Sequence, residues 1–138
     1  MPELHFTIPI TPKGQKRDRI GSFGGHAHSY KDKGQSQYED QVRVLISQHK
    51  PEFPVDNCPV ELTVVVYLPI PKSKPKCWKQ CALEGKIRPL TKPDCSNALK
   101  NIEDVMNKIF YRDDCLITDE HVCKRYSDNP RWEITLSW

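Results

Sequence analysis

The 138-residue chain lacks any long hydrophobic run. No stretch approaches the roughly 20 apolar residues that span a bilayer, and the N-terminus contains no apolar core of a signal peptide. We therefore expect an intracellular, cytoplasmic protein without a membrane partner. Thiols stay reduced in that compartment, so the six cysteines are expected to be free rather than paired in disulfides.

The chain also lacks a strong excess of charge of one sign, since its net charge is only +3. That value alone does not indicate a nucleic-acid-binding protein, but the charges are unevenly distributed. The segment 72–92 has one acid, Glu84, and seven cations: Lys72, Lys74, Lys76, Lys79, Lys86, Arg88 and Lys92. A second basic group consists of Lys13, Lys16, Arg17 and Arg19. Such groups attract phosphates, although solvated surface loops have the same composition.

No internal repeat, low-complexity tract or second domain is visible, so residues 1–138 are expected to form a single domain. Period-two alternation of apolar residues predicts strands over residues 4–10, 60–68, 116–126 and 131–138. Pro9 indicates that the first strand lies at an edge or ends there, and apolar residues on both faces of the second indicate a central strand. The last two strands are predicted to form an antiparallel hairpin.

Two main helices are predicted between these strands. The first follows a capping box at Ser36 and Glu39 and runs to about His49, and the second begins after Asp94. A short helix is predicted over residues 75–83, whereas residues 11–34 show no apolar period and are expected to form a long functional loop. The elements together predict an α+β fold with two main helices packed on a mixed four-stranded sheet.

The stretch from Lys92 to Asp114 has the most informative pattern. Apolar residues recur at helical spacing and predict a buried stripe: Ala98, Leu99, Ile102, Val105, Met106 and Ile109. Ser96, Lys100, Glu103 and Asn107 line up on the opposite face. Asp94 precedes this helix, and Asp113 and Asp114 follow it. Several acids and one lysine that a single helix brings together are typical of a metal-dependent site that cleaves phosphodiesters.

Each of these residues also has a purely structural explanation. Asp94 is a favoured N-cap residue, and Asp113-Asp114 is ordinary turn chemistry before a strand. Lys100 and Glu103 form a common solvated pair at i, i+3. The functional interpretation therefore depends on the joint occurrence of these residues with the basic segment.

The pattern K-P-D-x-x-N-x-x-K from Lys92 to Lys100, then a helix and D-D, resembles the RusA family of Holliday-junction resolvases, common in phages and prophages. The resemblance implies a homodimeric, Mg²⁺-dependent endodeoxyribonuclease that makes paired nicks in four-way DNA junctions, with essential acids at Asp94 and Asp114 and a catalytic lysine at Lys100. The best-known members read D-x-D-N where this chain has Asp94-Cys95-Ser96-Asn97. A serine hydroxyl is a poor substitute for an anionic ligand, so we hypothesise that the missing charge is supplied by Glu103.

The acids favour a hard cation, Mg²⁺ or in its place Mn²⁺, and no small-molecule cofactor is expected. In this interpretation Asp94 and Asp114 are metal ligands and Glu103 or Asp113 completes the set. Asn97 would position a ligand or a phosphate, and the two basic groups would hold the DNA backbone. Two alternatives stay open: a non-catalytic junction-binding protein with a degenerate metal site, and a nuclease directed at RNA or without substrate preference.

Three further motifs have weaker interpretations. Cys77 and Cys81 have a C-x₃-C spacing, and His26 and His28 are two residues apart, but neither pair has further zinc ligands at the usual spacing. Trp78 fits two roles equally: it stacks on a nucleotide, or it anchors the short helix to the body of the protein.

Overall fold

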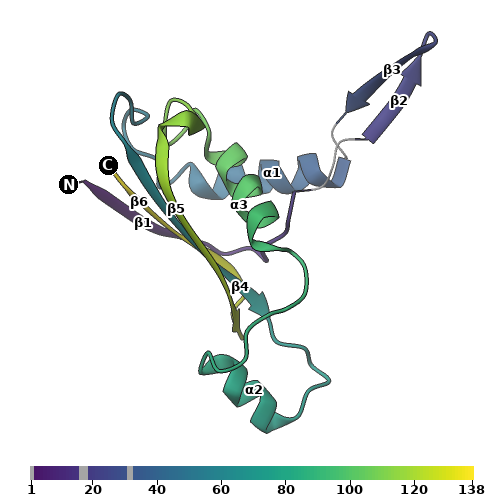
Figure 1. Cartoon of the computed structure of the whole chain (residues 1–138), viewed down its shortest axis with the longest axis vertical. Helices are drawn as coiled ribbons and strands as arrows, with labels where there is room; N and C mark the ends of the chain where they lie inside the picture. Colours follow the sequence, from purple (N-terminus) through teal and green to yellow (C-terminus); the bar gives the residue numbers. More distant parts are fainter. Residues whose placement is uncertain (1, 16–18, 31–32) are drawn as a thin grey trace.

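The computed structural model describes residues 2–15, 19–30 and 33–138. It has the predicted α+β architecture (Figure 1). The described elements are β1 (Glu3–Ile8), β2 (Arg19–Phe23), β3 (His26–Tyr30), α1 (Lys33–Ile46), β4 (Val60–Pro69), α2 (Lys76–Leu83), α3 (Cys95–Met106), a 3₁₀ turn (Asp114–Leu116), β5 (Ile117–Ser127) and β6 (Arg131–Ser137).

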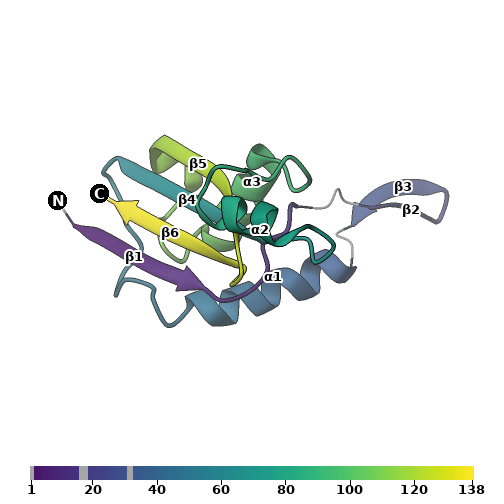
Figure 2. The same ribbon diagram turned by 90° about the horizontal axis from the view of Figure 1, so that it is seen from below.

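The main sheet is mixed and four-stranded, with the strand order β1-β6-β4-β5. β4 is antiparallel to β6 and parallel to β5, while β1 pairs antiparallel with β6. The predicted central position of β4 and the edge position of β1 are therefore confirmed. Helices α1 and α3 lie against one face of this sheet (Figures 1 and 2). Within the described residues, no helix is both long and apolar enough to span a bilayer.

The core fills the space between this face and the two helices. Alternate side chains of the central strands point into it, as the period of two predicts: Leu62, Val64 and Val66 from β4, and Trp132, Ile134 and Leu136 from β6. From α3, Ala98, Ile102, Val105 and Met106 are fully buried. Leu99 and Ile109 are only partly buried at the rim of the core. α3 ends at Met106, and the chain turns at Lys108, whose φ is +67°.

The predicted hairpin of the last two strands is wrong. The turn at residues 127–130 is present, but β5 and β6 are not hydrogen-bonded to each other, because β4 lies between them. β4 is apolar on the core face and half-buried on the other. A position between two strands therefore buries more of its apolar surface than a position at the edge of the sheet would. β5 is consequently an edge strand, with several exposed residues near its start.

The prediction of a loop over residues 11–34 is also wrong. β2 and β3 form a separate two-stranded hairpin that projects from the body (Figure 1). Gly24 and Gly25 connect the strands, both with positive φ (+59° and +81°), as tight hairpin turns require. Lys16 and Arg17 lie outside the described residues, as do the side chains of Arg19, His26 and His28.

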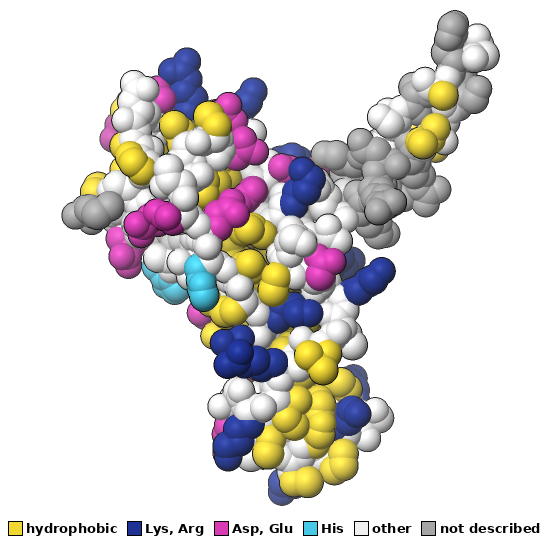
Figure 3. Space-filling view, in the orientation of Figure 1, with side chains coloured by type: hydrophobic (Ala, Val, Ile, Leu, Met, Phe, Trp, Pro, Cys, Tyr) yellow, Lys and Arg dark blue, Asp and Glu magenta, His cyan; other side chains and the backbone are white. Residues whose placement is uncertain are grey.

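The predicted capping box is wrong as well, because α1 already begins at Lys33. Glu39 is buried, and its Oε1 accepts a hydrogen bond of 3.0 Å from Gln35 Nε2 rather than capping the helix. The helix ends at Ile46, three residues earlier than predicted. The short basic helix α2 lies at the opposite end of the molecule from the free ends of β1 and β6 (Figure 1), in a lobe with apolar and basic side chains at its surface (Figure 3).

Candidate active site

The start of α3 is fixed by Asp94. The Asp94 carboxylate accepts hydrogen bonds from the backbone N–H of Asn97 at 2.8 Å and from Ser96 Oγ at 3.2 Å. The residue is extended, with φ −76° and ψ 162°, so it is the helix N-cap. Ser96 thus supports the Asp94 carboxylate as a donor. Both side chains stay exposed to solvent.

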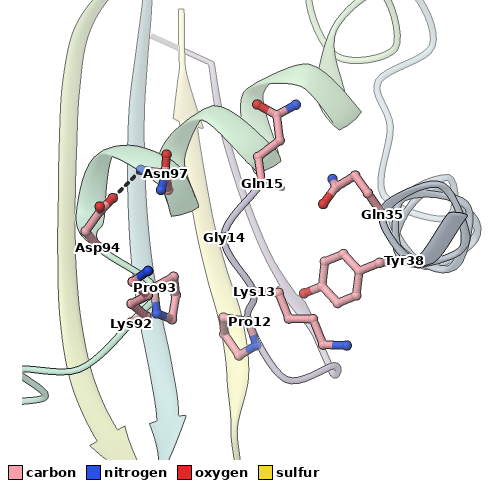
Figure 4. A pocket seen from close by; sticks show the side chains of 11 residues that line it. Pro12, Lys13, Gly14, Gln15, Gln35, Tyr38, Lys92, Pro93, Asp94 and Asn97 are labelled. Carbon is pink, nitrogen blue, oxygen red and sulfur yellow. Dashed lines mark hydrogen bonds between the residues drawn. The ribbon is translucent and has the colours of Figure 1, made fainter. Parts of the chain in front are cut away.

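A cavity of about 820 Å³ opens beside this helix start (Figure 4). Its walls come from the loop after β1, from α1 and from the residues that lead into α3. Lys13, Lys92, Asp94 and Asn97 all line it, so two lysines and the N-cap carboxylate share one opening. Gly14 allows the walls to approach, because a Cβ there would lie 3.1 Å from Pro93 Cβ and 3.3 Å from Asn97 Cβ.

A buried polar network holds the loop after β1 against the two helices. Asn101 Nδ2 donates to the Lys13 carbonyl at 2.8 Å, and Asn101 Oδ1 accepts from Gln35 Nε2 at 3.0 Å. Tyr38 donates to the Thr11 carbonyl at 2.7 Å and accepts from Trp132 Nε1 at 2.9 Å. Burial raises the pKa of Tyr38 to about 12. Buried groups satisfied in this way fix one arrangement of the cavity wall.

Four acids come together near the other end of α3. Glu103 and Asp104 belong to α3, Asp114 opens the 3₁₀ turn, and Glu120 belongs to β5. Glu120 is paired with Leu62 in the parallel register, which places it on the face of the sheet that α3 covers. Burial, the adjacent Glu120 carboxyl and the charges of Asp114 and Asp104 raise the pKa of Glu103 to about 8.

The segment that carries Asp114 is held by main-chain contacts. Val55 and Tyr111 form a bridge, with Arg112 N donating to the Val55 carbonyl at 2.9 Å. The buried Tyr111 hydroxyl donates to the Glu103 carbonyl at 2.8 Å and so ties this segment to the last turns of α3. The hydrogen-bonded Asp113 carboxyl raises the pKa of Asp114, and Lys100 acts in the opposite direction. Lys100 Nζ lies 3.9 Å from Asp104 Oδ2.

Two oxygens in this region are buried without a hydrogen-bond partner in the described part of the chain: Glu103 Oε1 and Asn107 Oδ1. Asn107 immediately follows the last residue of α3 and lies four residues after Glu103, so the two side chains are about one helical turn apart. Buried acceptors are normally satisfied, and hard oxygen donors beside several carboxylates fit a hard divalent cation such as Mg²⁺. Within the described residues, no group of three or more His, Cys, Asp or Glu side chains is already gathered into a metal-binding arrangement. The residues therefore fit such an ion by chemistry, and the carboxylates would have to converge on it.

The predicted site residues are thus placed in two parts. Asp94 and Asn97 line the cavity at the start of α3, whereas Glu103 and Asp114 lie in the acid cluster with Asp104 and Glu120. Asp94 precedes Glu103 by nine residues, which is about 13 Å along a helix axis. Lys100 lies between the two parts. Asp104 and Glu120 were missed by the sequence prediction, although an acid at a core-facing position of a strand is a recognisable signal.

The predicted DNA-binding lysines are also divided. Lys13 and Lys92 line the cavity, whereas Lys72, Lys74, Lys76 and Lys79 belong to the α2 lobe. In that lobe Trp78 meets the Tyr126 ring edge-on at 5.5 Å, and Lys74 Nζ lies 5.1 Å from the centre of the Trp78 ring. These contacts match the anchoring role of Trp78. All six cysteines, Cys77 and Cys81 included, are free thiols.

The N-cap role of Asp94 can be separated from a catalytic role. Asp94→Ala should lower the free energy of unfolding by about 1 kcal/mol, because the Asn97 N–H loses its acceptor. Asp94→Asn should leave stability nearly unchanged, since asparagine caps helices equally well while removing the charge. Urea unfolding of both variants measures the first role, and phosphodiester cleavage, if the residue has a catalytic role, measures the second. Full cleavage by Asp94→Asn would leave Asp94 as a cap alone.

Comparison with known proteins identifies the family of the chain. The family model described as endodeoxyribonuclease RusA matches residues 9–137. An uncharacterised protein of Bacillus subtilis (strain 168), YqaN, is 38% identical over 136 residues, covering 96% of this chain and 94% of its own length. A crossover junction endodeoxyribonuclease RusA of Lactococcus phage r1t is 26% identical over 136 residues, covering 98% of this chain and 96% of its own. The chain therefore belongs to the RusA family of endodeoxyribonucleases.

Proposed function

We propose that this chain is a divalent-metal-dependent endonuclease that resolves four-way DNA junctions by paired nicks. The proposal rests on the acid cluster at the end of α3, where the buried Glu103 Oε1 has no hydrogen-bond partner in the described part of the chain, beside Asp114 and Glu120. Family membership and the likeness to a phage crossover junction endonuclease support the choice of substrate. In this proposal residues 1–138 act as one endonuclease domain in the bacterial cytoplasm.

Mg²⁺, or Mn²⁺ in its place, would be held by Glu103, Asp114 and Asn107, with Asp113 or Glu120 completing the set. When bound, such an ion offsets charge on the phosphate and makes a water molecule more acidic. The cluster itself concentrates negative charge, which is stable only when a cation or bound protons balance it. Glu103 would exchange its proton for the cation, because its pKa of about 8 lies close to the working pH.

Lys100 and the cap residues would act on the DNA. Lys100 is exposed and lies beside Asp104, so its ammonium can reach a phosphate at the cluster and neutralise the charge that develops there. Asn97, Lys13 and Lys92 line the cavity at the start of α3 and would hold the neighbouring backbone. Asp94 would orient this helix start, and it would bind metal only if the DNA or a partner subunit closes the distance to the cluster.

We further propose that the active form is a homodimer. Two nicks at symmetric positions require two active sites related by a two-fold axis, which matches the symmetry of a four-way junction. The basic groups of both subunits would then contact the DNA backbone. Binding by such groups depends strongly on salt and carries no sequence information.

The test is cleavage of an end-labelled synthetic four-way junction, compared with a linear duplex of the same sequence, in Mg²⁺ and in chelator. Paired nicks that require both the junction and Mg²⁺ are the expected result. A second candidate is a non-catalytic junction-binding protein, favoured by Ser96 at the position of the family's second aspartate and by the N-cap role of Asp94. Tight junction binding without cleavage in any divalent ion would establish that alternative.

A further inference from the structure

A second hollow lies in the α2 lobe, away from the acid cluster. It encloses about 360 Å³ between the end of β4, α2 and the turn that follows β5. Pro69, Ile70 and Leu83 supply apolar walls, while Lys72 and Lys79 supply charge. The volume falls within the range of about 300–1,000 Å³ in which small-molecule sites are found. We call this hollow the lobe groove.

The lobe groove combines exposed apolar surface with a cationic surround. Leu83 is 45% exposed, although it is the last residue of α2. Lys72, Lys74 and Lys76 are exposed in the same lobe, and the acid Glu84 is paired with Lys86 at 2.9 Å. Asp128 lines the groove on the side of the β5 turn and is outnumbered there by Lys72 and Lys79. Figure 3 shows the same mixture of apolar and basic side chains on the face of the lobe that it presents.

We propose that the lobe groove binds a single unstacked nucleotide at the branch point of a DNA junction. The base would lie on Ile70 and Leu83, and its phosphate would contact Lys72 or Lys79. This inference rests on the proposed function, because it supplies the preference for branched over linear DNA. A nucleotide is the ligand that matches both properties of the groove, since it pairs an apolar face with an anionic group.

Trp78 is not available for this role. Its ring is already packed edge-on against Tyr126 at 5.5 Å and contacted by Lys74 at 5.1 Å, so stacking a base on it would break existing contacts. Leu83, in contrast, has free surface facing the groove. Bases inside a duplex are stacked on both sides and cannot enter. At a branch point unstacking costs less, so the groove would favour junctions without reading sequence.

The experiment uses the full chain and a four-way junction that carries 2-aminopurine, a fluorescent adenine analogue, at the branch point. The analogue is dim when stacked and bright when it leaves the stack. Chelator prevents cleavage, so affinity is measured by anisotropy on the intact junction and on a linear duplex. Leu83→Ser is compared with Leu90→Ser, a matched control in the same basic segment that is 93% exposed and outside the groove.

Wild type and Leu90→Ser should brighten the junction probe equally. Leu83→Ser should lose this signal and bind the junction about tenfold more weakly, with unchanged affinity for the duplex. Lys79→Gln should do the same, and an unfolding midpoint in urea equal to that of wild type would exclude a local folding defect in α2 as the cause. Wild-type signal and affinity in Leu83→Ser would overturn the groove proposal while leaving junction cleavage intact. Failure of wild type to bind or cut the junction would overturn both proposals.

Discussion

Replacing Asp114 with asparagine should lower the rate of junction cleavage at least about 100-fold, while affinity for the junction stays the same or increases slightly. Asp114 is exposed in the acid cluster, and its charge acts on the half-buried Glu103 carboxyl group. Removing that charge weakens the attraction for a divalent cation. It also removes the repulsion between this carboxylate and the DNA phosphates, so affinity for the junction does not fall. Single-turnover cleavage and anisotropy in chelator measure the two effects separately.

Asp119→Asn is the matched control for this prediction. Asp119 lies five residues further along, is exposed, and is adjacent in β5 to Glu120, so its side chain points to the opposite face of the strand. The control should cleave at the wild-type rate. Wild-type cleavage by Asp114→Asn would remove Asp114 from the mechanism. An equal loss in both variants would show that any reduction of negative charge near β5 impairs the enzyme.

The elements that pack on the core were predictable, because burial imposes a period on the sequence. The alternation of Leu62, Val64 and Val66 indicated a strand, and the helical spacing of Ala98, Ile102 and Val105 indicated a buried face of α3. The β2–β3 hairpin was missed because it projects from the body and has no such face. Gly24-Gly25 was the available signal, since adjacent glycines suit a tight hairpin turn.

The order of the strands in the sheet was harder to predict from the sequence than the residues that form them. β5 and β6 are consecutive and linked by a short turn, so local reasoning pairs them. The insertion of β4 between them depends on long-range packing, in which β4 pairs with both β5 and β6. The position of β4 also determines which acids form the cluster, because the parallel register with β4 places the Glu120 side chain on the face of the sheet that α3 covers. The acid cluster therefore could not be assembled from the helix pattern alone, which gave Glu103 and Asp114 but omitted Glu120.

Replacing Glu103 with glutamine should stabilise the metal-free protein at pH 8 and abolish cleavage. In the folded state Glu103 keeps its proton up to a pKa of about 8, whereas an unperturbed glutamate ionises near 4.5. Between these values the folded state binds more protons than the unfolded state, so the stability of wild type falls as the pH rises. Glutamine does not ionise and avoids this loss. The gain at pH 8 should be about 1–2 kcal/mol after allowance for solvent screening, and smaller at pH 5.

Urea unfolding in chelator at both pH values measures this gain, with Glu84→Gln as the matched control. Lys86 holds the pKa of the Glu84 carboxyl below its usual range, so that variant should not gain stability as the pH rises. Millimolar Mg²⁺ should raise the melting temperature of wild type, because a ligand that binds only the folded state stabilises it, and should have little effect on Glu103→Gln. Equal stabilisation of both proteins by Mg²⁺ would exclude Glu103 as a ligand. The expected result is that Glu103→Gln no longer responds to Mg²⁺, no longer cleaves, and is more stable than wild type without metal. This result would mean that the chain gives up stability at Glu103 in order to hold the ion that the chemistry needs.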